Sequence, residues 1–143
     1  MEHDPEAIPE FRITGLDGIT ELVIEPMMWP EPPVHYRQIV IRVIHKTTGY
    51  YRLVVAGLND LYTALEEWPA GHGYDISDTF GRRGEVMREV SGHVDIRAWK
   101  PGRDRLTTRF RMTLEPEAVD RVVNFLDVVR RNGWEAALAT RTE

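Results

Sequence analysis

The sequence predicts an α+β fold in which a curved, mostly antiparallel sheet of six or seven strands is packed by two helices. Several short runs alternate apolar and polar residues, which is the period of a half-buried strand. Two other runs place apolar residues three and four positions apart, which is typical of one helix face. Turn signals rich in Gly, Asp and Pro separate these runs. The expected order of elements is therefore ββ-ββ-α-βββ-α.

The first strand pair is expected between Phe11 and Ile24. Asp17-Gly18 between the two strands is a hairpin turn signal. The segment 25–33 that follows contains four prolines, which prevent a regular element there. This Pro-rich segment is either a covering loop or an exposed binding loop.

The second strand pair gives the clearest sheet signal. Ile39, Ile41 and Val43 alternate along residues 36–44, and apolar residues on the other face as well indicate a central strand. A turn at 46–49 leads to a returning strand over residues 50–55 that is rich in β-branched and aromatic residues.

A change of period after Gly57 predicts the first helix. Five apolar residues stand at helical spacing: Leu58, Leu61, Tyr62, Leu65 and Trp68. Asn59 is the expected N-cap, and Asp60 lies in the first turn, where the helix dipole favours an acid. Pro69 ends this helix. The glycine-rich residues 69–84 are then expected to form one long loop.

The last three strands are expected over residues 86–90, 93–99 and 105–114. A five-residue turn at 100–104 would pair Trp99 with Arg105 and place Asp95 opposite Arg109. The alternation assigns one set of residues to the inner face of the last pair: Val94, Ile96, Ala98, Leu106, Thr108, Phe110, Met112 and Leu114.

The second helix opens at Glu115-Pro116, with proline at its first position. Its apolar stripe is Val119, Val122, Val123, Leu126 and Val129, and Gly133 is the expected C-cap. The domain organisation that follows is a flexible tail at 1–10, a single α+β domain at 11–133, and a C-terminal tail or short helix at 134–143.

Composition limits the classes of function. The chain has 143 residues, a formal net charge of −5 and no cysteine, which excludes disulfides, thiolate catalysis and zinc–sulfur sites. The acidic N-terminus does not resemble a secretory signal, and no apolar run is long enough to span a membrane. We expect a cytoplasmic protein.

Charge alternates along the chain. Residues 34–56 carry no acid, residues 57–80 carry no Lys or Arg, and residues 81–112 are mostly basic. Cross-strand pairing of opposite charges is the simplest explanation for such alternation.

The chemical motifs of enzymes are missing from the sequence. The five histidines have no metal-binding spacing, and neither a G-x-S-x-G elbow nor a phosphate-binding glycine loop is present. His93 could be a general base oriented by Asp95, but a strand-edge histidine bonded in its turn is the simpler interpretation. Glu66 and Glu67 are adjacent on a helix, so their side chains diverge. The sequence predicts no catalytic residue, no metal site and no cofactor.

Two surfaces are candidates for binding. The first is acidic, with interleaved aromatics, and suits a basic protein partner: Asp60, Glu66, Glu67, Trp68, Asp75 and Asp78. Its simpler explanation is a solvated helix face with Trp68 and Tyr74 turned into the core. The second is a basic strand face that could follow a single-stranded nucleic acid, or could merely be solvated: Arg97, Trp99, Arg105, Arg109 and Arg111.

Short motifs carry a family resemblance over about residues 34–131. They are the stretch 58–66, the Gly92-His93-Val94 strand start, and the entry to the last helix at 114–117. The chain resembles an uncharacterised actinobacterial family of small α+β proteins, and is similar to the immunity proteins named WapI. After the Gly-His-Val strand that family has a longer turn and a tryptophan in the next strand, whereas residues 105–114 contain none. The resemblance implies an α+β fold and an immunity-type role.

The sequence thus favours a non-enzymatic cytoplasmic interaction protein. As an immunity protein it would bind and block a toxin through its acidic surface, with no membrane partner. One alternative is a nucleic-acid-binding module that uses the Arg and Trp face of strands 93–99 and 105–114. Another is a small-ligand-binding or hydrolase domain, which requires a deep pocket with perturbed titratable groups.

Overall fold

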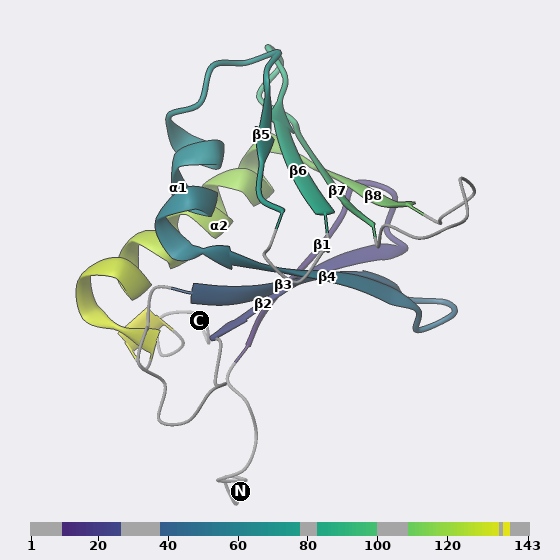
Figure 1. The fold of residues 1–143 in the computed structure, drawn as a ribbon, viewed down its shortest axis with the longest axis horizontal. Coiled ribbons are helices and arrows are strands. Elements are labelled where there is room, and N and C mark those ends of the chain that lie inside the picture. The colour runs from purple at the N-terminus through teal and green to yellow at the C-terminus, as the bar shows by residue number, and fades with distance from the viewer. Residues whose placement is uncertain (1–9, 27–37, 78–82, 100–108, 135, 138–143) are drawn as a thin grey trace, which may run out of the picture.

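Two four-stranded antiparallel sheets and two helices make up the described part of the chain. The computed structural model describes residues 10–26, 38–77, 83–99, 109–134, 136 and 137. Residues 1–9 of the tail predicted at 1–10, and residues 27–33 of the Pro-rich segment, lie outside these residues. The sheets meet at a steep angle, and both helices lie in the angle between them (Figure 1).

The first sheet has the strand order β1-β2-β3-β4. Its strands are β1 (Phe11–Thr14), β2 (Thr20–Pro26), β3 (Gln38–His45) and β4 (Tyr51–Gly57). The Asp17-Gly18 turn joins β1 to β2 as predicted: Gly18 has a φ of 76°, and the Asp17 carboxylate accepts hydrogen bonds from the Ile19 and Thr20 N–H groups. The alternation that predicted these strands is confirmed, since Ile39, Ile41 and Val43 are all buried.

The second sheet has the order β5-β6-β7-β8. Its strands are β5 (Gly73–Asp75), β6 (Arg83–Arg88), β7 (Val94–Trp99) and β8 (Arg109–Leu114). The prediction of one sheet with six or seven strands is therefore wrong, although the α+β class with antiparallel strands is confirmed. The chain leaves the first sheet at Gly57 and passes directly into a helix. The extra strand, β5, lies within the loop predicted over 69–84, where three residues give no alternation to detect.

Each sheet is followed at once by a helix, so four strands and a helix occur twice in succession. Helix α1 (Leu58–Glu66) follows β4, and α2 (Pro116–Asn132) follows β8. The N-cap of α1 is Gly57 rather than the predicted Asn59. A Cβ atom at Gly57 would lie 2.8 Å from Oδ2 of Asp60, so glycine allows the acid to fold back over the helix start.

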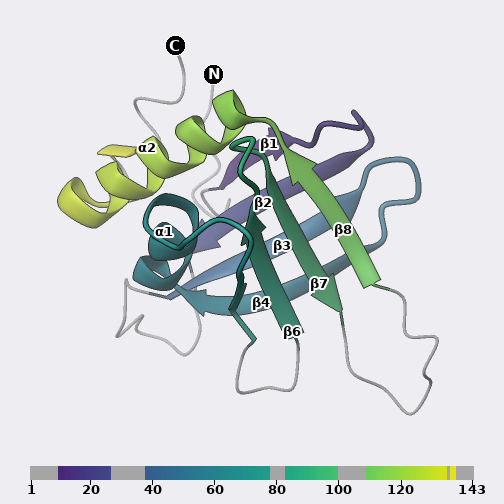
Figure 2. The ribbon, with the colours of Figure 1, turned by 90° about the horizontal axis from the view of Figure 1, so that it is seen from above.

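One hydrophobic core joins the inner faces of both sheets to both helices. Phe11 of β1 stacks on Phe125 of α2 with ring centroids 4.4 Å apart. Trp134, just beyond α2, contacts Phe125 edge-on and is 9% exposed, so residues after the helix also pack against the core. Seen from above, the second sheet crosses over the first and α1 lies beside α2 (Figure 2).

The register of β7 and β8 differs from the prediction. Trp99 is paired with Arg109 rather than Arg105, and Asp95 faces Thr113 rather than Arg109. The predicted inner and outer faces survive because the shift is by an even number of residues: Val94 faces Leu114 and both are buried.

No helix in the described ranges is long and apolar enough to cross a membrane.

Candidate interaction surface

The predicted acidic residues are distributed over both ends of α1 and the end of β5, and the contact of Tyr74 with Asp60 joins the two elements. Asp60, Glu66 and Glu67 lie on α1 or at its C-terminal end, Asp75 ends β5, and all four side chains are exposed. We call this group, with Trp68 and Tyr74, the acidic corner. Asp78, the remaining predicted acid, lies outside the described residues.

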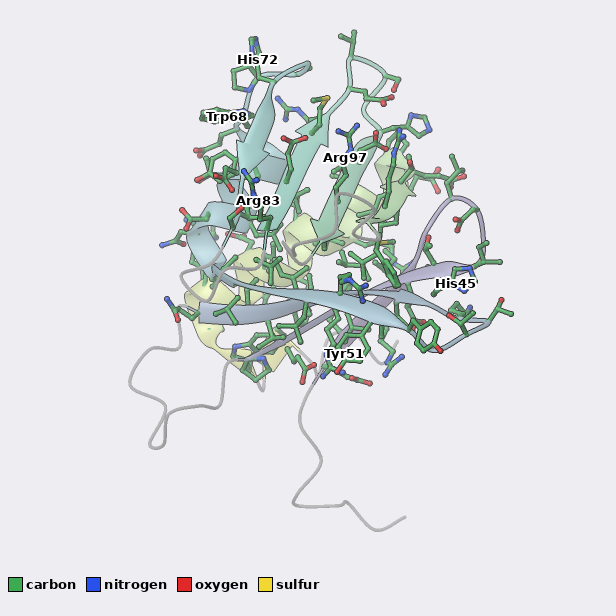
Figure 3. All side chains as sticks on the ribbon, turned by 45° about the vertical axis from the view of Figure 1, so that its right-hand side comes forward. His45, Tyr51, Trp68, His72, Arg83 and Arg97 are labelled. Atoms are coloured by element: carbon green, nitrogen blue, oxygen red, sulfur yellow. The ribbon has the colours of Figure 1, made fainter. Side chains whose placement is uncertain are left out.

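Two aromatic side chains form the base of the acidic corner. Trp68 meets Tyr74 edge-on, with ring centroids 4.8 Å apart, and both are partly buried. The Tyr74 hydroxyl donates a hydrogen bond of 3.1 Å to Oδ1 of Asp60. Desolvation and this bond to a carboxylate raise the pKa of Tyr74, so it stays protonated. Trp68 lies at the β5 edge of the second sheet (Figure 3), and its side chain is partly buried and partly exposed to solvent.

The carboxylates of the acidic corner form no ion pair with any described residue. Hydrogen bonds from the Ser77 side chain and N–H lower the pKa of Asp75, and the charge of Arg83 on β6 lowers it further, which keeps it charged. The charge of Glu67 acts on Arg130, but Arg130 is bonded to Asp127 at 2.6 Å and lies over the Tyr62 ring. The acidic corner therefore presents negative charge to solvent.

Arg88 of β6 fixes the C-terminal end of α1, a role that the sequence analysis missed. Its Nη1 donates to the main-chain oxygen of Glu66 at 3.0 Å, and lies 3.4 Å from that of Leu65. A cation suits this end of a helix because the unpaired carbonyls carry partial negative charge. The acidic corner is thereby held against the second sheet.

The predicted basic face is neutralised by acids on its own sheet. Asp95 is 3% exposed, and its carboxylate accepts hydrogen bonds from Arg111 at 2.8 Å and Thr113 at 2.6 Å. Arg97 lies 3.8 Å from Asp95 and 3.3 Å from Glu85 of β6. Arg97 and Arg83 lie on the exposed face of the second sheet (Figure 3). Arg105 and the side chains of Trp99 and Arg109 lie outside the described part of the structure.

Charge pairing across strands also holds in the first sheet. Arg12 of β1 lies 2.6 Å from Glu21 of β2, and Arg42 of β3 is paired with the nearly buried Glu25 of β2. Of the ion pairs among the described residues, Arg42–Glu25 joins the acidic first segment to the basic segment 34–56, whereas the acids of 57–77 form no such pair, so cross-strand pairing explains only part of the charge alternation. The pairing of Glu85 with Arg97 could not be predicted from the sequence, because it depends on the length of the turn between β6 and β7, which sets the register of the two strands.

His93 has no catalytic partner in the described residues. Its Nδ1 lies 2.9 Å from Oγ of Ser91, inside the turn, while the Asp95 carboxylate is bonded to Arg111 and Thr113. The interpretation of Asp95 as the orienting acid for a general base is therefore wrong. No group of three metal-ligating side chains occurs among the residues that the structure describes.

Comparison with protein-family models and with curated proteins finds no match for this chain.

Proposed function

We propose that this chain is a non-enzymatic interaction protein that binds a basic region of a protein partner through the acidic corner. The observation that carries the proposal is the set of four exposed carboxylates, none of them in an ion pair with a described cation. Elsewhere in the chain, acids such as Glu21, Glu25 and Asp95 are paired across strands. Unpaired charge at one corner suits a partner that supplies the opposite sign.

The contacts that hold α1 in place favour binding by a preorganised surface. Leu61 and Leu65 bury the inner side of α1, and Arg88 holds its C-terminal end. Carboxylates on a fixed base lose little conformational freedom when a partner docks. Trp68 and Tyr74 add partly exposed aromatic area at the centre, which is typical of residues that dominate binding energy.

The partner that we propose is a toxin, which the chain would block in the cytoplasm by occupying its basic surface. The resemblance to immunity proteins and the sign of the charge both support this. A nuclease toxin carries a basic cleft for its substrate, and an acidic inhibitor is drawn to it by long-range attraction. Association should then weaken as salt screens the charges.

A capture experiment from the native host tests this proposal. The bait is the full chain, compared with Glu66→Lys/Glu67→Lys and with Glu89→Lys/Asp120→Lys. The second double variant makes the same change in net charge at two exposed acids outside the acidic corner, at the turn after β6 and on α2. We expect one stoichiometric partner on the parent chain and the control, lost on Glu66→Lys/Glu67→Lys. Equal loss on both double variants, or no partner on any bait, would contradict the assignment.

Nucleic-acid binding by the basic strand face has weaker support. Arg97 is held by Glu85 and Asp95, and Arg111 is bonded to Asp95, so a phosphate backbone would have to displace those acids. A fluorescence titration with mixed single-stranded oligonucleotides at low salt decides between the two. Submicromolar affinity that falls steeply with salt would favour this alternative.

A further inference from the structure

We propose that the free edge of β1 is a second binding site, at which an extended peptide segment of a partner adds a strand to the first sheet beside α2. This site lies apart from the acidic corner and does not depend on it. It rests on the main-chain geometry of β1 and on the groove between β1 and α2.

β1 is an edge strand of the first sheet, and two of its residues make no main-chain hydrogen bond to described residues on the outer side. The Gly15 N–H bonds the Thr20 carbonyl at 2.8 Å, so Gly15 belongs to a hydrogen-bonded pair with β2. In an antiparallel ladder such pairs alternate, so the N–H and C=O groups of Arg12 and Thr14 face away from β2. No main-chain bond to a described residue satisfies these groups on the outer side. They form a template for a further strand.

A groove of about 320 Å³ lies along this edge. Ile13 and Thr14 line it from the strand, and Ala118 and Arg121 line it from α2, which runs alongside β1 (Figure 2). The stacking of Phe11 on Phe125 holds α2 at a fixed distance from β1. The small Ala118 side chain leaves room between helix and strand, an arrangement that lets a peptide lie against both.

The charges along the groove indicate what it would accept. Arg12 is already neutralised by Glu10 and Glu21, each at 2.6 Å. Glu115 and Glu117 line the groove where α2 begins, and neither forms a side-chain hydrogen bond or ion pair with a described residue. Arg121, one helical turn beyond Glu117, is the remaining charged residue in the lining, so the lining keeps an excess of negative charge. The occupant that fits is an extended segment with an apolar residue over Ile13 and Ala118, followed by a Lys or Arg beside the two glutamates.

The competing explanation is that β1 is a guarded edge, meaning an edge strand whose charged side chains prevent pairing with any further strand. Short edge strands with charged side chains are a common device against aggregation, and Arg12 would serve that purpose. A guarded edge binds no peptide, so a binding experiment separates the two explanations.

The test uses the full chain as bait for a phage-displayed library of random twelve-residue peptides. Selected peptides are then synthesised and titrated against variants. Thr14→Pro removes an outward N–H without breaking a bond to β2, because proline is tolerated at sheet edges. We expect at least a tenfold loss of affinity, and protection of the Arg12 and Thr14 amides from hydrogen exchange in the parent complex. Tyr51→Pro, which makes the same change at β4, the other edge strand of the first sheet, should bind as the parent does.

Ala118→Arg gives a second test that leaves β1 intact. The larger, charged side chain fills the groove from the helix side, and we expect the same tenfold loss. Asn124→Arg, on an exposed position of the same helix, is its control and should leave affinity unchanged. The proposal is overturned if no peptide is enriched, or if selected peptides bind Ala118→Arg as tightly as the parent. Since Glu66→Lys/Glu67→Lys should leave peptide affinity unchanged, failure here is distinguishable from failure of the acidic corner.

Discussion

Replacing Asp95 with alanine removes the carboxylate that three side chains of the second sheet share. Asp95 is 3% exposed and lies between Arg97 and Arg111, with Thr113 bonded to its Oδ1. Among the described residues, the variant leaves the Arg97 guanidinium with Glu85 alone and the Arg111 guanidinium with no acid. Asp95→Ala therefore tests whether the basic face is held together by its own acid.

The magnitude follows from the exposure of the partners. Each hydrogen bond to a charged group contributes about 1.5–3 kcal/mol, so the bonds to Arg111 and Thr113 set the scale. The Arg111 side chain is 50% exposed and can be rehydrated once its partner is gone, so its share is discounted. We expect Asp95→Ala to lower the free energy of unfolding by about 2–3 kcal/mol. Asp95→Asn, which can still accept from Thr113, should cost about 1 kcal/mol.

Urea unfolding followed by circular dichroism measures these differences, with the m-value checked for constancy. Asp120→Ala, at an exposed position on α2, is the control and should lie within about 0.5 kcal/mol of the parent. A loss below about 0.5 kcal/mol for Asp95→Ala would refute the reasoning, because Asp95 would then contribute no more than a surface charge.

Three further perturbations have outcomes set by the structure. Gly84→Ala places a Cβ 3.0 Å from Val54 between the two sheets, so thermal unfolding should show a loss of about 1–3 kcal/mol from overpacking. Phe125→Ala removes a ring packed on both sides, and chemical unfolding should show a loss of about 3–5 kcal/mol. Desolvation raises the pKa of Asp17, but hydrogen bonds from the N–H and hydroxyl of Thr20 and from the Ile19 N–H outweigh it, so the pKa is lowered on folding. That stabilisation is complete above the unfolded pKa of about 3.9 and is lost as pH falls through the folded value. The stability difference between parent and Asp17→Asn should therefore shrink below about pH 4, and a pH-independent difference would contradict it.

The first sheet could be predicted from the sequence because its signals are local. Alternation at Ile39, Ile41 and Val43 and the Asp17-Gly18 turn need no knowledge of distant contacts. The division into two sheets could not be predicted, because alternation shows that a face is buried but not which element covers it. β5 was missed for a related reason: Tyr74 is partly buried between exposed residues, a pattern too short to read.

The register of β7 and β8 shows the same limit. The alternation of Val94, Ile96 and Ala98 fixes their face but not their partners, because a slide by an even number of residues preserves the pattern. The sequence therefore predicted the exposure of the acidic residues, yet it could not predict that Asp95 would lie beside Arg111 and Thr113.

Site-specific photo-crosslinking tests the central claim most directly. A benzophenone side chain is placed at Glu67 in the acidic corner, and in a separate variant at Glu89, which is also exposed but lies at the turn after β6. After irradiation in the native host, the account predicts one cross-linked protein partner from position 67 and none from position 89. Cross-links of equal yield from both positions, or from position 89 alone, would contradict binding through the acidic corner.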